Sequence, residues 1–266
     1  MAEITAALVK QLREMTGAGM LDCKRALEDA EGDAPTAAQF LREKGLIKSA
    51  ERSGRDNTEG AVGTFLDAAR GVAALVELKC ETDFVAKNPD FVNLASDLAT
   101  LVAESGEAAA AQKKDGIDNL KITLKENIEV GRILRVEASA GHGLDLYEHR
   151  QAGRVKNGVV VEVTDGGREL AHEVAVHVAF MRPTYLTRDE VPAEEIERER
   201  ATLETIARNE GKPEAQLPKI LEGRLNGFFK ERCLMEQAFV KDEKQSIAQL
   251  LGDAEVVRFG QVEIGR

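Results

Sequence analysis

The segment between an apolar strand and a helix start constrains this chain most. Residues 72–78 form a nearly continuous apolar run, which is typical of a buried β-strand. Asn88 and Pro89 mark a helix start, because Asn caps a first turn and Pro fits its first position. Only residues 79–87 join the two, and they present Phe84 beside Asp83. Phe84 must therefore fold back into its own core or enter another molecule.

The pattern around this segment predicts an α+β unit. Alternating residues at 62, 64 and 66 and a turn at 69–71 predict a β-hairpin with the 72–78 strand. A helix is expected over 89–104, with Phe91, Leu94, Leu98 and Leu101 on one face, and another over 117–129. A strand over 131–137 completes the unit.

A comparable order recurs in the second half of the chain. A β-branched strand is expected over 155–163, a turn at 166–167, a helix over 170–180 and a closing strand over 255–264. Residues 144–149, which include Tyr147 and His149, are interpreted as a loop. The fold class is therefore α+β, with two related subdomains that contain small antiparallel sheets.

Two further regions flank these subdomains. Residues 1–47 predict three short helices, with Thr5 and Asp33 as N-caps and with Leu8, Leu12, Met15, Ala37, Phe40 and Leu41 on the apolar faces. Residues 48–59 have no apolar periodicity and are interpreted as a linker. Residues 184–232 predict a projecting antiparallel helical hairpin with a thin apolar stripe at Ile196, Leu203 and Ile206. The expected domains are 1–54, 55–140 and 141–266, with the hairpin inserted in the third.

Composition excludes several classes of protein. The net charge of −11 argues against a large nucleic-acid footprint, which needs clustered Lys and Arg. The chain has no apolar run of the ~18 to 20 residues that a membrane span needs. Its first residues lack a secretory pattern, and three widely spaced cysteines fit neither a disulfide framework nor a zinc site. We therefore expect a cytoplasmic protein with free thiols.

No group of residues predicts catalysis, a metal site or a cofactor site. A glycine-rich phosphate loop is absent, and the Gly17–Ala18–Gly19 sequence joins two helices without a preceding strand. His172 and His177 are five residues apart, which does not match a helical zinc pair. Cys80 lies beside Glu81, which disfavours a thiolate, so we interpret it as a packed residue. The chain is not expected to be an enzyme.

Two segments resemble the bacterial translation elongation factor Ts family. Residues 1–24 are similar to its N-terminal signature, and residues 82–88, Thr82 to Asn88, are similar to its second signature. Both occur in the expected order and at the expected distance. The resemblance implies an N-terminal UBA-like module and guanine-nucleotide exchange on elongation factor Tu, without bond chemistry.

The resemblance also implies where that partner binds. Thr82, Asp83, Phe84 and Val85 would act near the Mg²⁺ and phosphate end of the bound nucleotide, with Phe84 inserted between helices of the GTPase. Further contacts are expected at Val9, Leu12, Met20, Leu21, Lys87, Asn88, Tyr147 and His149. The hairpin resembles a coiled coil that mediates self-association.

A second hypothesis is a helix-binding adaptor or chaperone-like scaffold, which the small helical module and the charged hairpin suggest. It predicts several unrelated partners and a dispensable 82–88 segment. Some members of the resembled family continue into a C-terminal helical extension after the last strand, and this sequence ends at Arg266.

Overall fold

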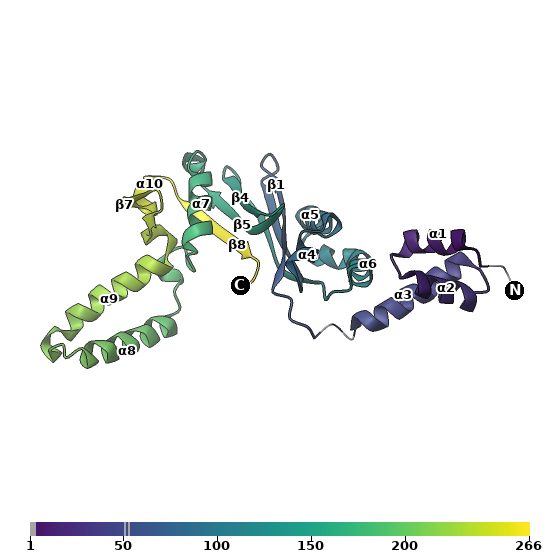
Figure 1. The fold of residues 1–266 in the computed structure, drawn as a ribbon. Helices are drawn as coiled ribbons and strands as arrows, with labels where there is room; N and C mark the ends of the chain where they lie inside the picture. The colour runs from purple at the N-terminus through teal and green to yellow at the C-terminus, as the bar shows by residue number, and fades with distance from the viewer. Residues whose placement is uncertain (1–3, 51, 53) are drawn as a thin grey trace.

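The centre of the molecule is a four-layer arrangement of helix, sheet, sheet and helix (Figure 1). The computed structural model describes residues 4–50, 52 and 54–266; residues 1–3, 51 and 53 of the expected module and linker lie outside it. The N-terminal helices extend from one side of this centre and a helical hairpin extends from the other, so the molecule is elongated. None of the described helices is long and apolar enough to cross a bilayer. The mixed α+β class is confirmed.

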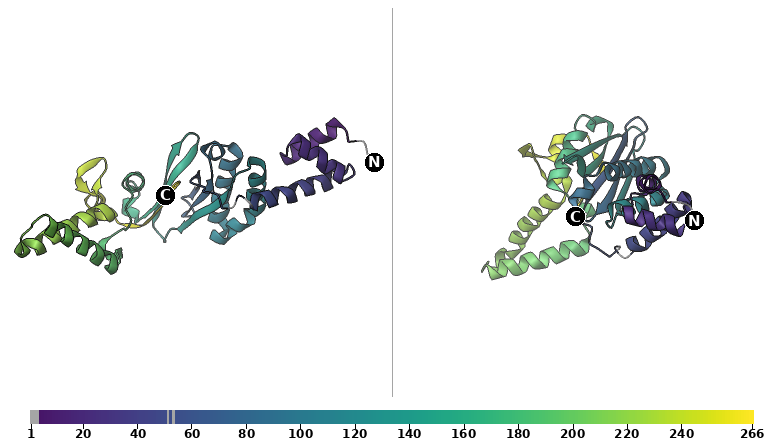
Figure 2. Two further views of the ribbon diagram at one scale, coloured as in Figure 1. Left: turned by 60° about the horizontal axis from the view of Figure 1, so that its bottom comes forward. Right: turned by 45° about the vertical axis from the view of Figure 1, so that its right-hand side comes forward.

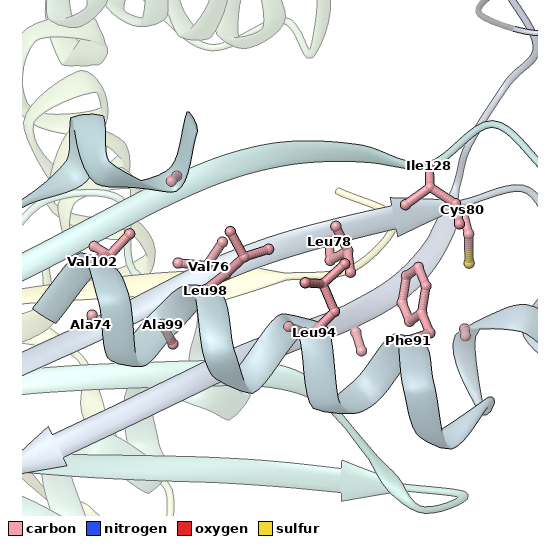
Figure 3. Packing of buried hydrophobic residues seen from close by; sticks show 14 of the residues in the cluster. Ala74, Val76, Leu78, Cys80, Phe91, Leu94, Leu98, Ala99, Val102 and Ile128 are labelled. Carbon is pink, nitrogen blue, oxygen red and sulfur yellow. The ribbon is translucent and has the colours of Figure 1, made fainter. Parts of the chain in front are cut away.

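The first sheet has the order β1-β2-β3 and is antiparallel throughout. It contains β1 (Glu59–Asp67), β2 (Val72–Cys80) and β3 (Glu129–Glu137). Helix α5 (Pro89–Ser105) covers one face, and Figure 3 shows Phe91, Leu94 and Leu98 directed toward β2. Val102 completes this buried face, whereas Leu101 is only half-buried. The expectation for Leu101 is wrong because helical spacing places Val102, four residues after Leu98, over the sheet.

The second sheet has the order β4-β5-β8, with α7 (Ala171–Met181) on its outer face. Its strands are β4 (Gly143–Gln151), β5 (Arg154–Val163) and β8 (Val256–Glu263). The interpretation of 144–149 as a loop is wrong, because these residues pair with β5 along its whole length. The order of hairpin, helix and closing strand does occur twice. The domain boundaries proposed from the sequence stay a prediction.

The inner faces of the two sheets pack against each other. Both contribute to one buried cluster, which includes Val62 and Leu75 from the first sheet and Val160 and Val262 from the second. Gly158 allows the close approach, because a Cβ atom there would lie 2.9 Å from Leu75 Cδ2. The sheets are therefore joined by an apolar core.

The N-terminal module consists of α1 (Ala6–Thr16), α2 (Met20–Asp29) and α3 (Ala34–Ala50). Thr5 and Asp33 accept hydrogen bonds from Leu8 N and Thr36 N, at 3.3 and 2.9 Å, as their expected capping roles require. Met15 and Phe40 are exposed, so their expected places on the buried apolar face are wrong. The apolar core of the module consists of Val9, Leu12, Cys23, Ala26, Leu27, Ala30, Ala37 and Leu41.

Helix α3 reaches three residues into the expected linker and lies against α6 (Lys114–Leu124). Arg42 pairs with Asp115 at 2.8 Å, and a Cβ atom at Gly45 would lie 2.8 Å from Ile122 Cγ2. Helix α6 starts three residues before the expected 117–129 and ends at Leu124, before the expected end. It ends there because Lys125 takes a left-handed φ of 60°. A 3-10 segment, η1 (Glu107–Lys113), leads into α6.

The projecting hairpin is formed by α8 (Ala193–Asn209) and α9 (Leu217–Arg232), and Figure 2 shows it directed away from both sheets. Ile196 and Leu203 pack in its seam as expected. Ile206 is exposed and Ala207 is buried instead, so the expectation for Ile206 is wrong by one residue. The other short elements are η2 (Asp165–Gly167), η3 (Arg188–Glu190), η4 (Glu214–Gln216), η5 (Leu234–Glu236), β6 (Ala238–Phe239), β7 (Asp242–Ser246) and α10 (Ile247–Leu251).

Candidate functional site

The segment that carries Phe84 forms a one-turn helix, α4 (Asp83–Ala86), for which the sequence pattern predicted no regular element. Thr82 caps it: its hydroxyl accepts a hydrogen bond from Val85 N at 3.4 Å. Asp83 in this first turn suits the positive end of the peptide dipoles. Phe84 is 82% exposed, the largest exposed fraction among the large apolar side chains that the structure describes as exposed.

The turn divides its side chains between core and solvent. Val85 and Ala86 are buried in the cluster that also contains Cys80 and Phe91. Val85 was expected to contact a partner, but its side chain lies in the protein's own core. Burial, together with nearby Glu126, raises the pKa of the Cys80 thiol to about 12, and the thiol donates to Thr82 O at 3.2 Å. Cys80 is thus a protonated packing residue in the core below the α4 turn, next to Val85 and Ala86.

Asp83 and Lys87 form an ion pair across the same turn, with 2.5 Å between Lys87 Nζ and Asp83 Oδ2. The hydrogen bond from Lys87 holds the pKa of Asp83 below its usual range. Asn88 caps α5 by accepting from Asp90 N at 2.8 Å. Two of the expected contact residues, Lys87 and Asn88, therefore have structural roles within the segment.

Sequence reasoning missed Glu126, which lies next to the turn. Its carboxylate accepts hydrogen bonds from Glu81 N and from Thr82 N, both at 3.0 Å. It also accepts one from the Thr82 hydroxyl at 2.5 Å. The contact spans 44 residues of sequence, so no local pattern could have revealed it.

A second exposed apolar surface lies on the N-terminal module. Met20 and Leu21, at the start of α2, are 58% and 61% exposed, so both are available for contact. Met15, at the end of α1, is exposed as well. Val9 and Leu12, the other expected contacts, are buried in the core of the module.

A third surface surrounds Tyr147 and His149 on β4. They line a cavity of about 430 Å³, together with Phe180 at the end of α7, which is 67% exposed. The Tyr147 hydroxyl and His149 Nδ1 are 3.3 Å apart. In Figure 1 the module, α4 and the α7–β4 layer follow one another along the molecule.

Exposed apolar side chains are the common feature of these three surfaces. Among the described residues, no group of three or more His, Cys, Asp or Glu side chains could hold a metal ion. Burial raises the pKa of Cys233 to about 11, so this thiol is protonated at neutral pH, as Cys80 is. The most prominent feature is an exposed ring on a capped, ion-paired turn.

Comparisons with known proteins give one consistent result. The family model described as "Elongation factor TS" matches residues 81–266. The chain is 43% identical to an elongation factor Ts of Paenarthrobacter aurescens, over 96% of each chain. It is 43% identical to one of Renibacterium salmoninarum and 42% identical to one of Streptomyces coelicolor, in each case over 100% of both chains.

Proposed function

Because the chain belongs to the elongation factor Ts family, we propose that it binds elongation factor Tu with bound GDP and promotes GDP release. In this proposal the Phe84 turn enters the GTPase near the Mg²⁺ and phosphate end of the nucleotide. The factor then stabilises the nucleotide-free GTPase. It forms and breaks no covalent bond.

The exposure of Phe84 is the observation that carries this proposal. A ring that is 82% exposed on an ordered turn has much apolar surface left to bury on binding. Burial of a Phe side chain contributes about 1.5 to 3 kcal/mol. That free energy can offset a displaced helix in the partner, and Mg²⁺ tolerates little displacement because it demands near-ideal octahedral geometry.

Thermodynamic linkage relates the binding of the factor to the binding of GDP. If the factor weakens GDP binding to the GTPase, GDP must weaken factor binding by the same ratio. The Phe84 turn, which we call the wedge, therefore needs more contact with the nucleotide-free GTPase than with the GDP-bound GTPase. The Asp83–Lys87 pair and the Thr82 cap support this role, since they order the backbone on both sides of Phe84.

The proposed second contact with the GTPase is made by Met20 and Leu21 on the module. The proposed third contact is made by Tyr147 and His149. Val9, Leu12 and Val85 would support these contacts from the core. We infer a cytoplasmic location from the proposed partner. Self-association through the hairpin and the absence of direct nucleic-acid binding stay predictions.

Release of a fluorescent GDP from elongation factor Tu tests the proposal directly. The Phe84→Ala variant should lower exchange efficiency about 10- to 150-fold, which corresponds to the lost ring burial. Ile206→Ala, which removes an exposed apolar side chain from the hairpin, is the matched control and should exchange like the parent. Full exchange activity of Phe84→Ala would contradict the proposed wedge.

A pull-down from cytosolic extract separates this function from the adaptor hypothesis. Capture of one dominant GTPase, which added GDP and Mg²⁺ then release from the protein, supports the exchange function. Several unrelated partners, retained by the Phe84→Ala variant, would favour the adaptor.

A further inference from the structure

We propose that Glu126 is a positioning residue that holds the Phe84 turn in the orientation it needs for entry into the partner. This inference rests on the proposed exchange function, because it assigns a role relative to the Phe84 wedge. Glu126 lies on the segment between α6 and β3, and its carboxylate is directed at the residues that precede Phe84.

The carboxylate accepts three hydrogen bonds with its two oxygens. Oε2 accepts from the backbone N–H groups of Glu81 and Thr82, and Oε1 accepts from the Thr82 hydroxyl. An ionised carboxylate accepts only, so three converging donors match it well. A glutamine has a single acceptor oxygen. Its NH₂ group would face either the two backbone N–H groups, which cannot accept, or the Thr82 hydroxyl, which would have to change from donor to acceptor.

The contact with the hydroxyl determines how Thr82 caps the turn. A hydroxyl has one hydrogen and two lone pairs. Since Thr82 donates its hydrogen to Glu126, a lone pair remains for Val85 N, which is the capping bond of α4. Glu126 thus acts on Phe84 through Thr82 and makes no direct hydrogen bond to the ring.

A reciprocal contact strengthens the same connection. Glu81 Oε1 accepts from Asn127 N at 2.7 Å, while Glu126 accepts from Glu81 N. The Asn127 side chain also donates to Arg55 O at 3.1 Å. Segments 81–82 and 126–127 are therefore joined in both directions, since a carboxylate from each segment accepts a backbone N–H of the other.

The supporting segment is itself held by the fold. Lys125 takes a left-handed φ of 60°, which ends α6 and turns the chain toward the Phe84 turn. Ile128, two residues after Glu126, is fully buried in the core of the first sheet. Glu126 is anchored between a packed helix and a packed strand, so it can restrain a four-residue helix that is too short to be stable alone.

Removal of this restraint should affect binding through preorganisation. A turn that samples several orientations must be ordered when the ring enters the partner, which costs affinity. We expect Glu126→Ala to lower exchange efficiency about tenfold, with Glu126→Gln intermediate. The effect should depend on Phe84, because Glu126 has no other part in the proposed wedge.

The experiment uses a tryptophan reporter in the full-length protein. The sequence has no tryptophan, so Phe84→Trp places a single fluorophore on the turn. Its anisotropy in the free protein reports the order of the turn without any partner. Glu129→Gln is the matched control, since Glu129 accepts from the Asn57 side chain at 3.0 Å and does not bond to the turn.

In the Phe84→Trp background, we expect lower tryptophan anisotropy when Glu126→Ala or Glu126→Gln is added, and no change when Glu129→Gln is added. In a Phe84→Ala background, Glu126→Ala should cause no further loss of exchange. Unchanged anisotropy with both Glu126 substitutions, or an additive loss of exchange in the double variant, would overturn the positioning role. If Glu126→Ala fails to fold, the nearly isosteric Glu126→Gln decides.

The same measurements separate this inference from the proposed function. Full exchange activity of the Phe84→Ala variant would reject the proposed role of Phe84 as a wedge. The tryptophan anisotropy of the free protein would still show whether Glu126 orders the turn. Conversely, slow exchange by Phe84→Ala with unchanged anisotropy in the Glu126 variants would leave the wedge in place and reject the role of Glu126.

Discussion

His177 illustrates, at the scale of a residue, how burial decides the chemistry of a side chain. It is fully buried, its Nδ1 accepts a hydrogen bond from Val240 N at 3.2 Å, and its Nε2 lies 2.9 Å from Gln237 Oε1. The ring must therefore be neutral, with the hydrogen on Nε2. Burial lowers the pKa of His177, and the hydrogen bond with Gln237 opposes this only in part.

Stability should consequently fall as the pH falls from about 6.5. Below this pH the unfolded chain binds a proton at His177 that the folded protein resists, and binding to the unfolded state favours unfolding. Urea unfolding at pH 7.5 and pH 5.5 measures the effect. His177→Leu should be less stable than the parent at pH 7.5 but should lose less stability on acidification, because it removes the buried imidazole. Equal slopes for the parent and His177→Leu would refute this assignment.

Among the secondary-structure elements, helices α3 and α6 make the contact that positions the N-terminal module. The Arg42–Asp115 pair is exposed and contributes little, so close packing at Gly45 and Ile122 is the more important part. Helix α6 is also followed directly by the segment that contains Glu126. One helix thus supports both the module and the Phe84 turn.

Two glycine substitutions separate helix propensity from this packing. Alanine is favoured over glycine within a helix by about 1 kcal/mol. Gly223 in α9 faces open space, so Gly223→Ala should stabilise the hairpin by up to that amount. Gly45→Ala has the same backbone advantage, but its methyl group would lie 2.8 Å from Ile122 Cγ2, so we expect loosened packing between α3 and α6.

Hydrogen exchange measures both effects locally. Amides of α3 and α6 should exchange faster in Gly45→Ala, and amides of α9 should exchange more slowly in Gly223→Ala. Slower exchange across α3 in Gly45→Ala would mean that Ile122 gives way at little cost.

The interface between the two sheets matters at the scale of the whole molecule. It fixes the orientation of the layer with the Phe84 turn relative to the layer with Tyr147 and His149. Leu75 lies at its centre and is fully buried. Any partner that touches both surfaces depends on this interface.

Leu75→Ala should therefore destabilise the protein by about 2 to 5 kcal/mol, the usual range for a buried leucine with a residual cavity. Leu66→Ala, at a partly exposed position of the adjacent strand, should cost much less. Chemical denaturation of both variants measures the difference. Similar losses would indicate that the sheets are not packed as tightly as the structure implies.

Local sequence patterns were sufficient to predict the class of fold, most of the helices and strands, and the family. These follow from information that is local in sequence: the alternation in β1, the periodicity of α5, the caps at Thr5, Asp33 and Asn88, and the two signature segments. Local free energies act over a few residues, so pattern reasoning can detect them.

Strand β4, the length of α3 and the environment of Phe84 depend on tertiary contacts that no local pattern predicts. Strand β4 is stable because it pairs with β5, and α3 continues beside α6 through residues whose own pattern suggested a linker. The turn at Phe84 depends on Glu126, 44 residues from Thr82. Such contacts form between segments whose sequences carry no mark of each other, because the free energy that selects them arises only when the chain is folded.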